Sequence, residues 1–337
     1  MTGPEVLTPR DVPLGGPRAM TVRRTLPQRD RTLIGAWCFL DHYGPDDVAE
    51  TGGMVVPPHP HTGLQTVSWL FTGEIEHRDS AGNVATVRPG EVNLMTAGHG
   101  ISHSEVSPAT TSVLHGAQLW VALPDAHRDT DPGFVHHVPE PVAGAGFVAR
   151  VFLGSLLGST SPVPTFTPLL GAELLLDPGA EAALEVDPGF EHGVLVDAGA
   201  VVLGDQPVGK DELCYLPPGA ERLVLRAGDA PARLLLLGGA PFGEAIVMWW
   251  NFVGRSHEEV VAFREAWQGQ VLAGPGTPAD EQHPDAAGGL PERPAAEQRV
   301  VASGQDVRPG RFGVVPGQEL PPIPAPPLPN ARLRERR

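Results

Sequence analysis

Two short histidine motifs carry the chemistry that this sequence suggests. The first, "HPHTG", places His59 and His61 two residues apart, and the second, "HGISHSE", does the same for His103 and Glu105. Residues i and i+2 of a strand point to one face, so each pair can direct two ligand atoms at one ion. Three imidazoles and a carboxylate suit a borderline transition metal and leave positions open for a substrate or dioxygen. We therefore predict a metal site. The alternative is a set of surface or hydrogen-bonded histidines.

The segments that must position these motifs read as short strands. Between residues 30 and 270, apolar runs of four to nine residues alternate with turns that contain Gly, Pro, Asp or Asn. Regular short strands indicate a closed or double-sheet β architecture. Ser256 and Glu259 form a capping box at the start of one expected helix. Val260, Phe263 and Trp267 then share one helical face and are expected in the core.

A faint internal repeat divides the chain. "SWLFTGEIEH" and "RPGEVNLMTAG" resemble "VLVDAGAVVL" and "GKDELCYLPPG", with Gly73 aligned to Gly199 and Gly98 to Gly219. Two copies of one β module, about residues 35–140 and 165–245, account for the length. The predicted organisation is an N-terminal metal-binding domain at residues 1–145 and a C-terminal domain at residues 146–272. Residues 273–337 are expected to form a Pro- and Gly-rich tail that is mobile or loosely draped over the body.

The second copy lacks the ligand pattern. At the offsets of the histidine pair it carries Glu185 and Asp187, and at the offsets of the "HSE" pair it carries Val224 and Arg226. A valine and an arginine cannot ligate a cation. We therefore expect the second copy to keep the fold without the metal. His192 has no partner at i+2 and is interpreted as a bystander.

The remaining histidines are weaker candidates. His99 lies in the "GHG" turn and could be an extra ligand, an acid–base group or a pocket-lining residue. His115 could support the ligands from behind, although a structural role is favoured. The histidines without a spacing argument are expected to be solvated: His77, His127, His136, His137, His257 and His283.

Composition limits the classes of partner and compartment. The formal net charge is −16, so no basic field could hold a phosphate backbone, and direct nucleic-acid binding is not expected. A protein partner is compatible with this charge. The N-terminus has no apolar signal region, and no run approaches about 18 apolar residues, so no membrane span is expected. Cys38 and Cys214 lie in apolar runs and read as buried free thiols. We expect a cytoplasmic monomer.

Several segments together resemble the pirin family of the cupin superfamily. They are "HPHTGLQTVSWLFTGEIEHRDSAGN", "RPGEVNLMTAGHGISHSE", "HGAQLWVALP", "AWCFLDHYGP" and "GEAIVMWWNFVGRSHEEV", and the similarity covers about residues 15–270. The resemblance implies an all-β bicupin, with two antiparallel β-barrel (jelly-roll) domains face to face and a metal in the N-terminal one only. A short C-terminal helix and the Pro-rich tail complete the predicted fold.

The resemblance also implies a cofactor and its ligands. Pirins usually hold iron through three His and one Glu, which map by motif onto His59, His61, His103 and Glu105. Fe²⁺ is therefore the expected ion, and Mn, Cu, Co, Ni or Zn are alternatives, because affinity alone favours copper for such ligands.

Two positions depart from the family pattern, and the family suggests two functions. The glutamate that often follows the histidine pair is Gln65 here, and the common arginine of the glycine turn is His99. The resemblance implies a quercetin 2,3-dioxygenase-type reaction of a flavonol or another small phenol with O₂. Glu105 is then the catalytic base, and Gln65, His99 and Gln118 are the substrate-binding candidates. The alternative is a redox-sensing regulator that binds a transcription factor or a metabolic enzyme.

Overall fold

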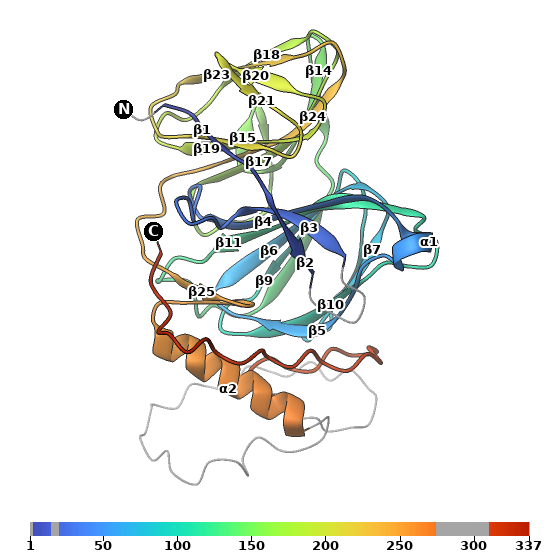
Figure 1. Ribbon diagram of the computed structural model, residues 1–337, viewed down its shortest axis with the longest axis vertical. Coiled ribbons are helices and arrows are strands. Elements are labelled where there is room, and N and C mark those ends of the chain that lie inside the picture. Colours follow the sequence, from blue (N-terminus) through green and yellow to red (C-terminus); the bar gives the residue numbers. More distant parts are fainter. Residues whose placement is uncertain (1–2, 15–19, 274–309, 337) are drawn as a thin grey trace.

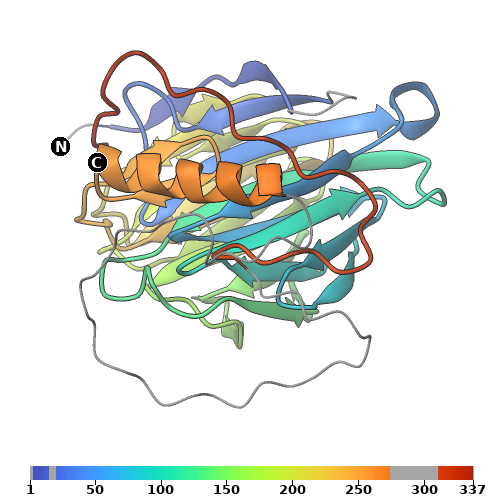
Figure 2. The same ribbon diagram turned by 90° about the horizontal axis from the view of Figure 1, so that it is seen from below.

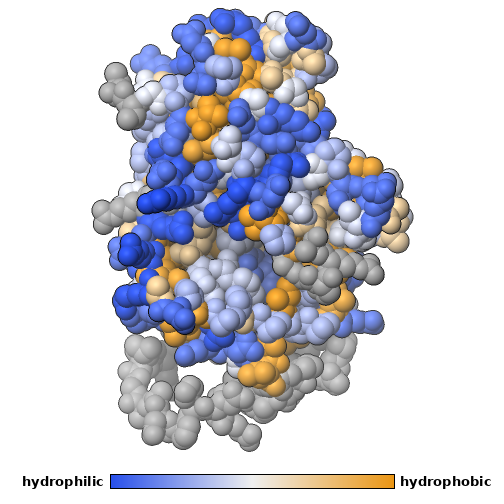
Figure 3. All heavy atoms as spheres, in the orientation of Figure 1, coloured by the Kyte–Doolittle hydropathy of each residue, from blue (hydrophilic) through white to orange (hydrophobic). Residues whose placement is uncertain are grey.

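Two β domains are stacked in the computed structural model, which describes residues 3–14, 20–273 and 310–336. Each domain packs a seven-stranded antiparallel sheet against a four-stranded one, the double-sheet form of a jelly roll (Figure 1). The predicted all-β bicupin is confirmed. Cys38 and Cys214 are buried free thiols, as predicted. Hydrophilic side chains cover most of the face shown in Figure 3.

The N-terminal domain contains both histidine motifs on its smaller sheet. Its larger sheet has, in spatial order, β12 (Gly133–His137), β9 (Val92–Thr96), β6 (Leu64–Thr72), β11 (Val113–Ala122), β4 (Trp37–Asp47), β3 (Thr21–Leu26) and β2 (Arg10–Pro13). Its smaller sheet has β5 (Val55–His61), β10 (Ile101–Val106), β7 (Ile75–Asp79) and β8 (Val84–Val87). A four-residue helix, α1 (Val48–Thr51), follows β4.

The C-terminal domain repeats this arrangement. Its larger sheet has β1 (Glu5–Leu7), β22 (Leu213–Leu216), β19 (Glu191–Ala198), β24 (Ala232–Gly239), β17 (Leu169–Leu176), β14 (Phe147–Leu153) and β13 (Pro141–Gly144). Its smaller sheet has β18 (Glu181–Glu185), β23 (Arg222–Ala227), β20 (Val201–Leu203) and β21 (Gln206–Val208), and a hairpin joins β15 (Ser155–Leu156) to β16 (Ser159–Thr160). Both β1 and β13 lie within residues 1–145, the range expected for the N-terminal domain. They belong to the C-terminal domain instead, because each pairs with a strand of its larger sheet.

Equivalent glycine turns relate the two copies. Gly73 ends β6 with φ +87°, and a Cβ there would lie 2.4 Å from the Val113 carbonyl oxygen. Gly199 ends β19 with φ +73°, and a Cβ there would lie 2.4 Å from the Pro231 carbonyl oxygen. Both turns therefore require a residue without a side chain. The alignment of these two glycines in the sequence corresponds to the structure.

The two seven-stranded sheets face each other and share one apolar core. Leu40 and Val67 from the first domain pack in the same cluster as Leu195 and Leu235 from the second. Trp37 of β4 is fully buried, and its Nε1 donates to the carbonyl oxygens of two residues in the other domain, Leu170 at 3.3 Å and Gly238 at 3.1 Å. The domains are thus joined by a continuous core as well as by hydrogen bonds.

The last elements return to the N-terminal domain. The hairpin of β25 (Val247–Trp249) and β26 (Phe252–Gly254) precedes α2 (His257–Ala273), and Phe252 bridges to Thr62 beside β5. Val260, Phe263 and Trp267 of α2 are buried, as predicted. Ser256 caps the helix through its Oγ, which accepts from the Glu259 amide at 3.1 Å. Neither of the two helices in the described residues is long and apolar enough to cross a membrane.

Residues 310–336 form an extended segment, here called the C-terminal strap, that lies beside α2 under the N-terminal domain (Figures 1 and 2). Phe312 is buried, the Ile323 amide donates to the Pro58 carbonyl at 2.8 Å, and the Trp267 Nε1 donates to the Ile323 carbonyl at 2.8 Å. The sequence predicted a tail that is mobile or loosely draped over the body. The strap does lie over the body but is packed against it, while residues 274–309 lie outside the described residues.

Candidate metal centre

Three histidine side chains converge at one end of the N-terminal domain. His59 and His61 come from β5, and His103 comes from the neighbouring strand β10, where it pairs directly with His59. One ring nitrogen of each lies within 4.8 Å of the other two. All three rings are buried. The two predicted strand motifs therefore meet because their strands are adjacent and antiparallel.

Backbone carbonyls fix which nitrogen of His59 and His61 carries the proton. His59 Nδ1 lies 3.0 Å from the Pro57 carbonyl oxygen, and His61 Nδ1 lies 3.1 Å from that of Asn251. A carbonyl only accepts, so each Nδ1 donates and each Nε2 keeps its lone pair. Burial lowers the pKa of His59 to about 4 and the pKa of His61 well below its usual value. Both side chains are neutral near pH 7, as metal ligands must be.

A buried chain of hydrogen bonds orients His103. Asp79 Oδ2 lies 3.3 Å from His77 Nε2, and His77 Nδ1 lies 3.3 Å from His103 Nδ1. If His77 donates to the carboxylate, its Nδ1 accepts from His103, and the His103 Nε2 lone pair is free. That Nε2 faces His61 Nε2 at only 3.1 Å. A shared cation would remove the repulsion between two such lone pairs, so the donor set fits a divalent metal.

Glu105 lies at the edge of this centre. It groups with His77 and His103, whereas His59 and His61 group with His103 alone. Within 4.8 Å, the ligand atoms form two triads that share His103, and the set of four ligands stays a prediction. The register of β10 on β5 shifts between His103 and Glu105, which accounts for the offset. Burial raises the pKa of the Glu105 carboxyl.

Glu105 is only loosely held by its polar neighbour. Ser68 Oγ lies 2.9 Å from Gln118 Oε1 and 3.5 Å from Glu105 Oε1. A hydroxyl has one proton to donate, and the shorter contact goes to Gln118. The carboxylate therefore retains capacity to accept another hydrogen bond or a proton.

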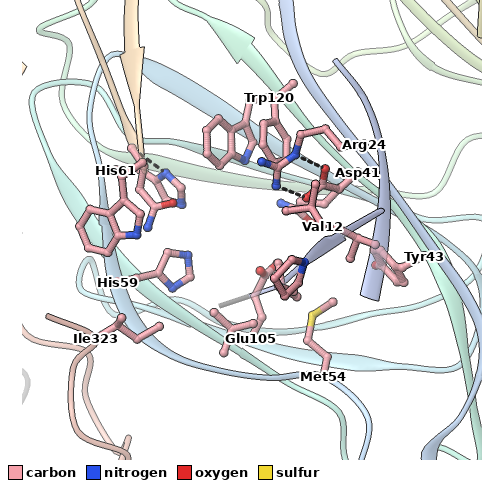
Figure 4. A pocket seen from close by; sticks show the side chains of 18 of the residues that line it. Val12, Arg24, Asp41, Tyr43, Met54, His59, His61, Glu105, Trp120 and Ile323 are labelled. Atoms are coloured by element: carbon pink, nitrogen blue, oxygen red, sulfur yellow. Dashed lines mark hydrogen bonds and ion pairs between the residues drawn. The ribbon is translucent and has the colours of Figure 1, made fainter. Parts of the chain in front are cut away.

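A cavity of about 370 Å³ opens in front of these side chains (Figure 4). Phe39 and Trp120 stack at 4.0 Å between ring centroids on its wall. Arg24 binds the Asp41 carboxylate through both oxygens, at 2.6 and 2.7 Å. Ile323 brings the C-terminal strap into the lining. A flat aromatic molecule with polar substituents matches these walls.

The three substrate-binding candidates have different positions. Gln118 lines the cavity, as expected. Gln65 does not, because it sits on the face of β6 that Val67 shares, and its Nε2 donates to Thr96 Oγ1 at 3.0 Å. His99 does not line it either: its side chain is 43% exposed and lies 3.7 Å from Asp131. Neither Gln65 nor His99 is therefore placed at the wall of this cavity, and their contacts with a substrate stay predictions.

Sequence reasoning also missed residues of the site. His77 was expected in solvent but is 3% exposed, because β7 alternates buried Ile75, His77 and Asp79 with partly exposed residues. This alternation was visible in "IEHRD". Arg24 and Asp41 were also missed. Asp41 directly follows the apolar run "WCFL" of β4 and is buried, and a charged residue next to such a run is a usable signal, whereas Arg24 lies in the polar strand "TVRRTL" and has none.

The other histidines fall into separate classes. His127 and His136 are exposed, and His137 and His257 are partly exposed, whereas His283 lies outside the described residues. His192 is fully buried in β19 and belongs to no group of potential ligands in the described part of the chain. His115 is buried at the junction of the two domains.

The equivalent strands of the second domain carry no such centre. Their inward side chains are apolar: Ala182, Leu184, Leu223 and Leu225. Glu185 and Arg222 point outwards and lie 3.5 Å apart. The interior between these strands is filled with aliphatic side chains, so the described residues place no ligand there.

The two antiparallel cupin domains, with a histidine cluster in the first only, define a bicupin. The Pirin family model matches residues 19–121, and the model "Pirin C-terminal cupin domain" matches residues 171–272. The chain belongs to the pirin family.

Individual relatives are similar over most of this length. A Pseudomonas aeruginosa protein named "Putative quercetin 2,3-dioxygenase" is 47% identical over 263 residues, which is 78% of this chain and 82% of that protein. A pirin-like protein of Caulobacter vibrioides is 37% identical and covers 73% of this chain and 88% of its own length. The crystal structure of quercetin 2,3-dioxygenase from Acinetobacter baumannii has a TM-score of 0.82 at 34% identity and covers 99% of this chain and 98% of its own.

Proposed function

We propose that this protein is a metal-dependent dioxygenase that opens the ring of a flavonol or a related phenol with O₂. One observation carries the proposal: three buried, neutral histidines converge beside a loosely held carboxylate at a cavity with an aromatic wall. The names of the relatives support the same reaction class. No contact or surface within the described ranges favours the regulatory alternative.

The proposed resident ion is Fe²⁺, held by His59, His61 and His103, with Glu105 as a further, more weakly placed ligand. When bound, the ion supplies a Lewis acid for the substrate enolate and a position for dioxygen. Mn, Co, Ni, Cu and Zn compete for the same donors, since imidazole suits all of these ions.

Glu105 is proposed as the general base. Its pKa is raised by burial, so its carboxylate holds a proton more strongly than one in water. The Ser68 hydroxyl donates its hydrogen bond mainly to Gln118. Glu105 can therefore accept the hydroxyl proton of a phenol that enters the cavity.

The cavity walls would orient the substrate. Phe39 is stacked between Trp120 and the Arg24 guanidinium, and this stack gives the cavity an aromatic wall for a flat ring. The paired side chains of Arg24 and Asp41 offer a donor and an acceptor for phenolic hydroxyls. Apolar residues such as Ile323 exclude water, which limits side reactions of activated oxygen.

The test is flavonol turnover by the reconstituted protein. Protein loaded separately with Fe²⁺, Mn²⁺, Co²⁺, Ni²⁺ or Cu²⁺ is mixed with quercetin under O₂, and the loss of flavonol absorbance and the release of carbon monoxide are recorded. At least one metal form should turn over, and the H59A/H61A variant should be inactive. Absence of turnover with every metal would overturn the proposal.

Glu105→Gln isolates the proton transfer. The amide keeps the shape of the side chain but cannot act as a base, so we expect kcat to fall by about 10²–10⁴-fold. Metal content should persist because the three histidines remain. Glu76→Gln, on the neighbouring strand β7, is the matched control and should leave kcat unchanged. A normal kcat in Glu105→Gln would remove Glu105 from the mechanism.

A further inference from the structure

A second group of potential ligands lies where the two domains meet. His42 of β4 and His115 of β11 come from the first domain, and Asp197 of β19 comes from the second. Their ligand atoms lie within 4.8 Å of one another, and all three side chains are buried. We propose that this interdomain cluster is a second metal site, for a borderline divalent ion such as Zn²⁺. Two imidazoles and one carboxylate are a familiar ligand set for that ion.

One carboxylate oxygen is shared by both imidazoles of the cluster. His115 Nε2 lies 2.6 Å and His42 Nε2 lies 2.7 Å from Asp197 Oδ1. Asp197 Oδ2 is buried, lies 3.5 Å from Arg233 Nε and makes no hydrogen bond among the described residues. Ligands of one cation stand close together and direct their lone pairs at the ion. A bound ion would take the place of the imidazole protons and would also give Asp197 Oδ2 a partner, and buried polar atoms are rarely left unpaired.

A further carboxylate supports His42 from behind. Asp211 Oδ1 lies 3.2 Å from His42 Nδ1, while His42 Nε2 lies 2.7 Å from Asp197 Oδ1. A carboxylate beside the far nitrogen is a usual support of a metal-binding histidine, and with the proton on Nδ1 the Nε2 lone pair would be available to an ion shared with Asp197. Asp79 and His77 support His103 from behind in the same way at the three-histidine centre. Arg23 also approaches His42 Nδ1, through its Nη2 at 3.4 Å.

Two guanidinium groups set the expected strength of this site. Arg23 Nε lies 3.1 Å from Asp211 Oδ1, and Arg233 Nε lies 3.5 Å from Asp197 Oδ2. These positive charges partly neutralise the two carboxylates and oppose a cation. The interdomain site should therefore bind more weakly than the three-histidine centre. Since its ligands come from both domains, the ion would act as a cross-link between them.

The competing account is a metal-free network of hydrogen bonds and ion pairs, and metal stoichiometry separates the two. Chelator-treated wild type and the H59A/H61A variant are loaded with Zn²⁺, dialysed and analysed for metal. We expect two ions per chain in the wild type and one in H59A/H61A, which lacks the first centre. An H59A/H61A variant that binds no Zn²⁺ would overturn the proposal.

Added substitutions localise the remaining ion. H59A/H61A with His115→Gln or Asp197→Asn should bind none, whereas H59A/H61A with His137→Ala, a matched histidine outside the cluster, should still bind one. Zn²⁺ should also raise the Tm of H59A/H61A by several degrees and leave the Tm of the Gln and Asn variants unchanged. Near-UV circular dichroism verifies that at least one of those two variants is folded. Retention of the ion in a folded variant, or an absent Tm shift in H59A/H61A, would refute the cross-linking site.

Discussion

At the scale of single residues, the three-histidine cluster is supported by side chains that do not belong to it. His77 is held between Asp79 and His103, and its ring lies against Phe134 at 4.8 Å between centroids. With its Nε2 donating to Asp79, His77 accepts from His103 Nδ1 and so holds the ring orientation and the tautomer of His103. Such supporting partners contribute to metal affinity because they make the ligand nitrogen more basic and restrict its motion.

Replacing His77 by Phe should weaken metal binding without removing a ligand of the three-histidine group. Phenylalanine fills the space but cannot accept from His103 Nδ1, so we expect the metal affinity to fall by about 10–100-fold. Competition with a chromophoric chelator measures this change. His136→Phe, on the exposed side of β12, is the control. Equal affinities for wild type and His77→Phe would show that the chain from Asp79 has no influence on the centre.

The residues of the site were predictable where spacing along one strand decides the geometry. His59 and His61 were found because alternate residues of a strand share a face. That β10 lies beside β5, and that the register shifts between His103 and Glu105, follows from strand pairing, which the spacing within one motif does not contain. Arg24 contributes to the site only through tertiary packing, which brings β3 in front of the cavity.

At the scale of elements, the C-terminal strap forms part of the cavity in front of the three histidines. Ile323 lines it, and the strap is held at this residue from both sides by the Pro58 carbonyl and the Trp267 indole. Further along, Gln318 Nε2 donates to Ser104 Oγ at 3.0 Å, next to His103. The strap is thus fixed to the strands that carry the histidines, and it shapes the space before them.

Enlarging Ile323 should obstruct the cavity. Ile323→Trp adds a bulky ring at the wall, so we expect the Kd for quercetin to rise about tenfold, equivalent to about 1.4 kcal/mol. Metal content should stay the same, because no histidine contacts are lost. Val314→Trp, at an exposed position of the same strap, should bind quercetin normally. Indistinguishable Kd values for the two variants would mean that the strap does not limit the substrate.

The elements differ in how well a sequence defines them. The helix α2 was found because a cap is followed by buried residues at helical spacing. The strap has many prolines and no periodicity, so nothing local distinguishes a packed extended segment from a loose one. Its conformation depends on contacts with α2 and β5 that lie far away in the chain. The pairing of β1 with β22 was missed for the same reason, since its partner lies about 200 residues away.

At the scale of the whole molecule, the two domains are parts of one cooperative structure. Their larger sheets bury a common core, and Trp37 reaches from one domain to the backbone of the other. An interface this apolar resembles a domain interior more than a contact between independent units. Separating the domains would expose the core of both, so neither should remain folded while the other unfolds.

Calorimetry of the metal-free protein should therefore show a single transition, with the calorimetric enthalpy close to the van't Hoff enthalpy. Trp37→Ala leaves a cavity in the shared core and two carbonyls unpaired, so it should reduce the free energy of unfolding by about 3–5 kcal/mol. Leu184 lies inside the second domain, away from the interface. Leu184→Ala should reduce the free energy of unfolding in the same single transition by about 2–5 kcal/mol. Two resolved transitions, with Leu184→Ala affecting only one, would instead describe domains that fold separately. A single transition that both substitutions shift to lower temperature would mean that the two domains unfold as one unit.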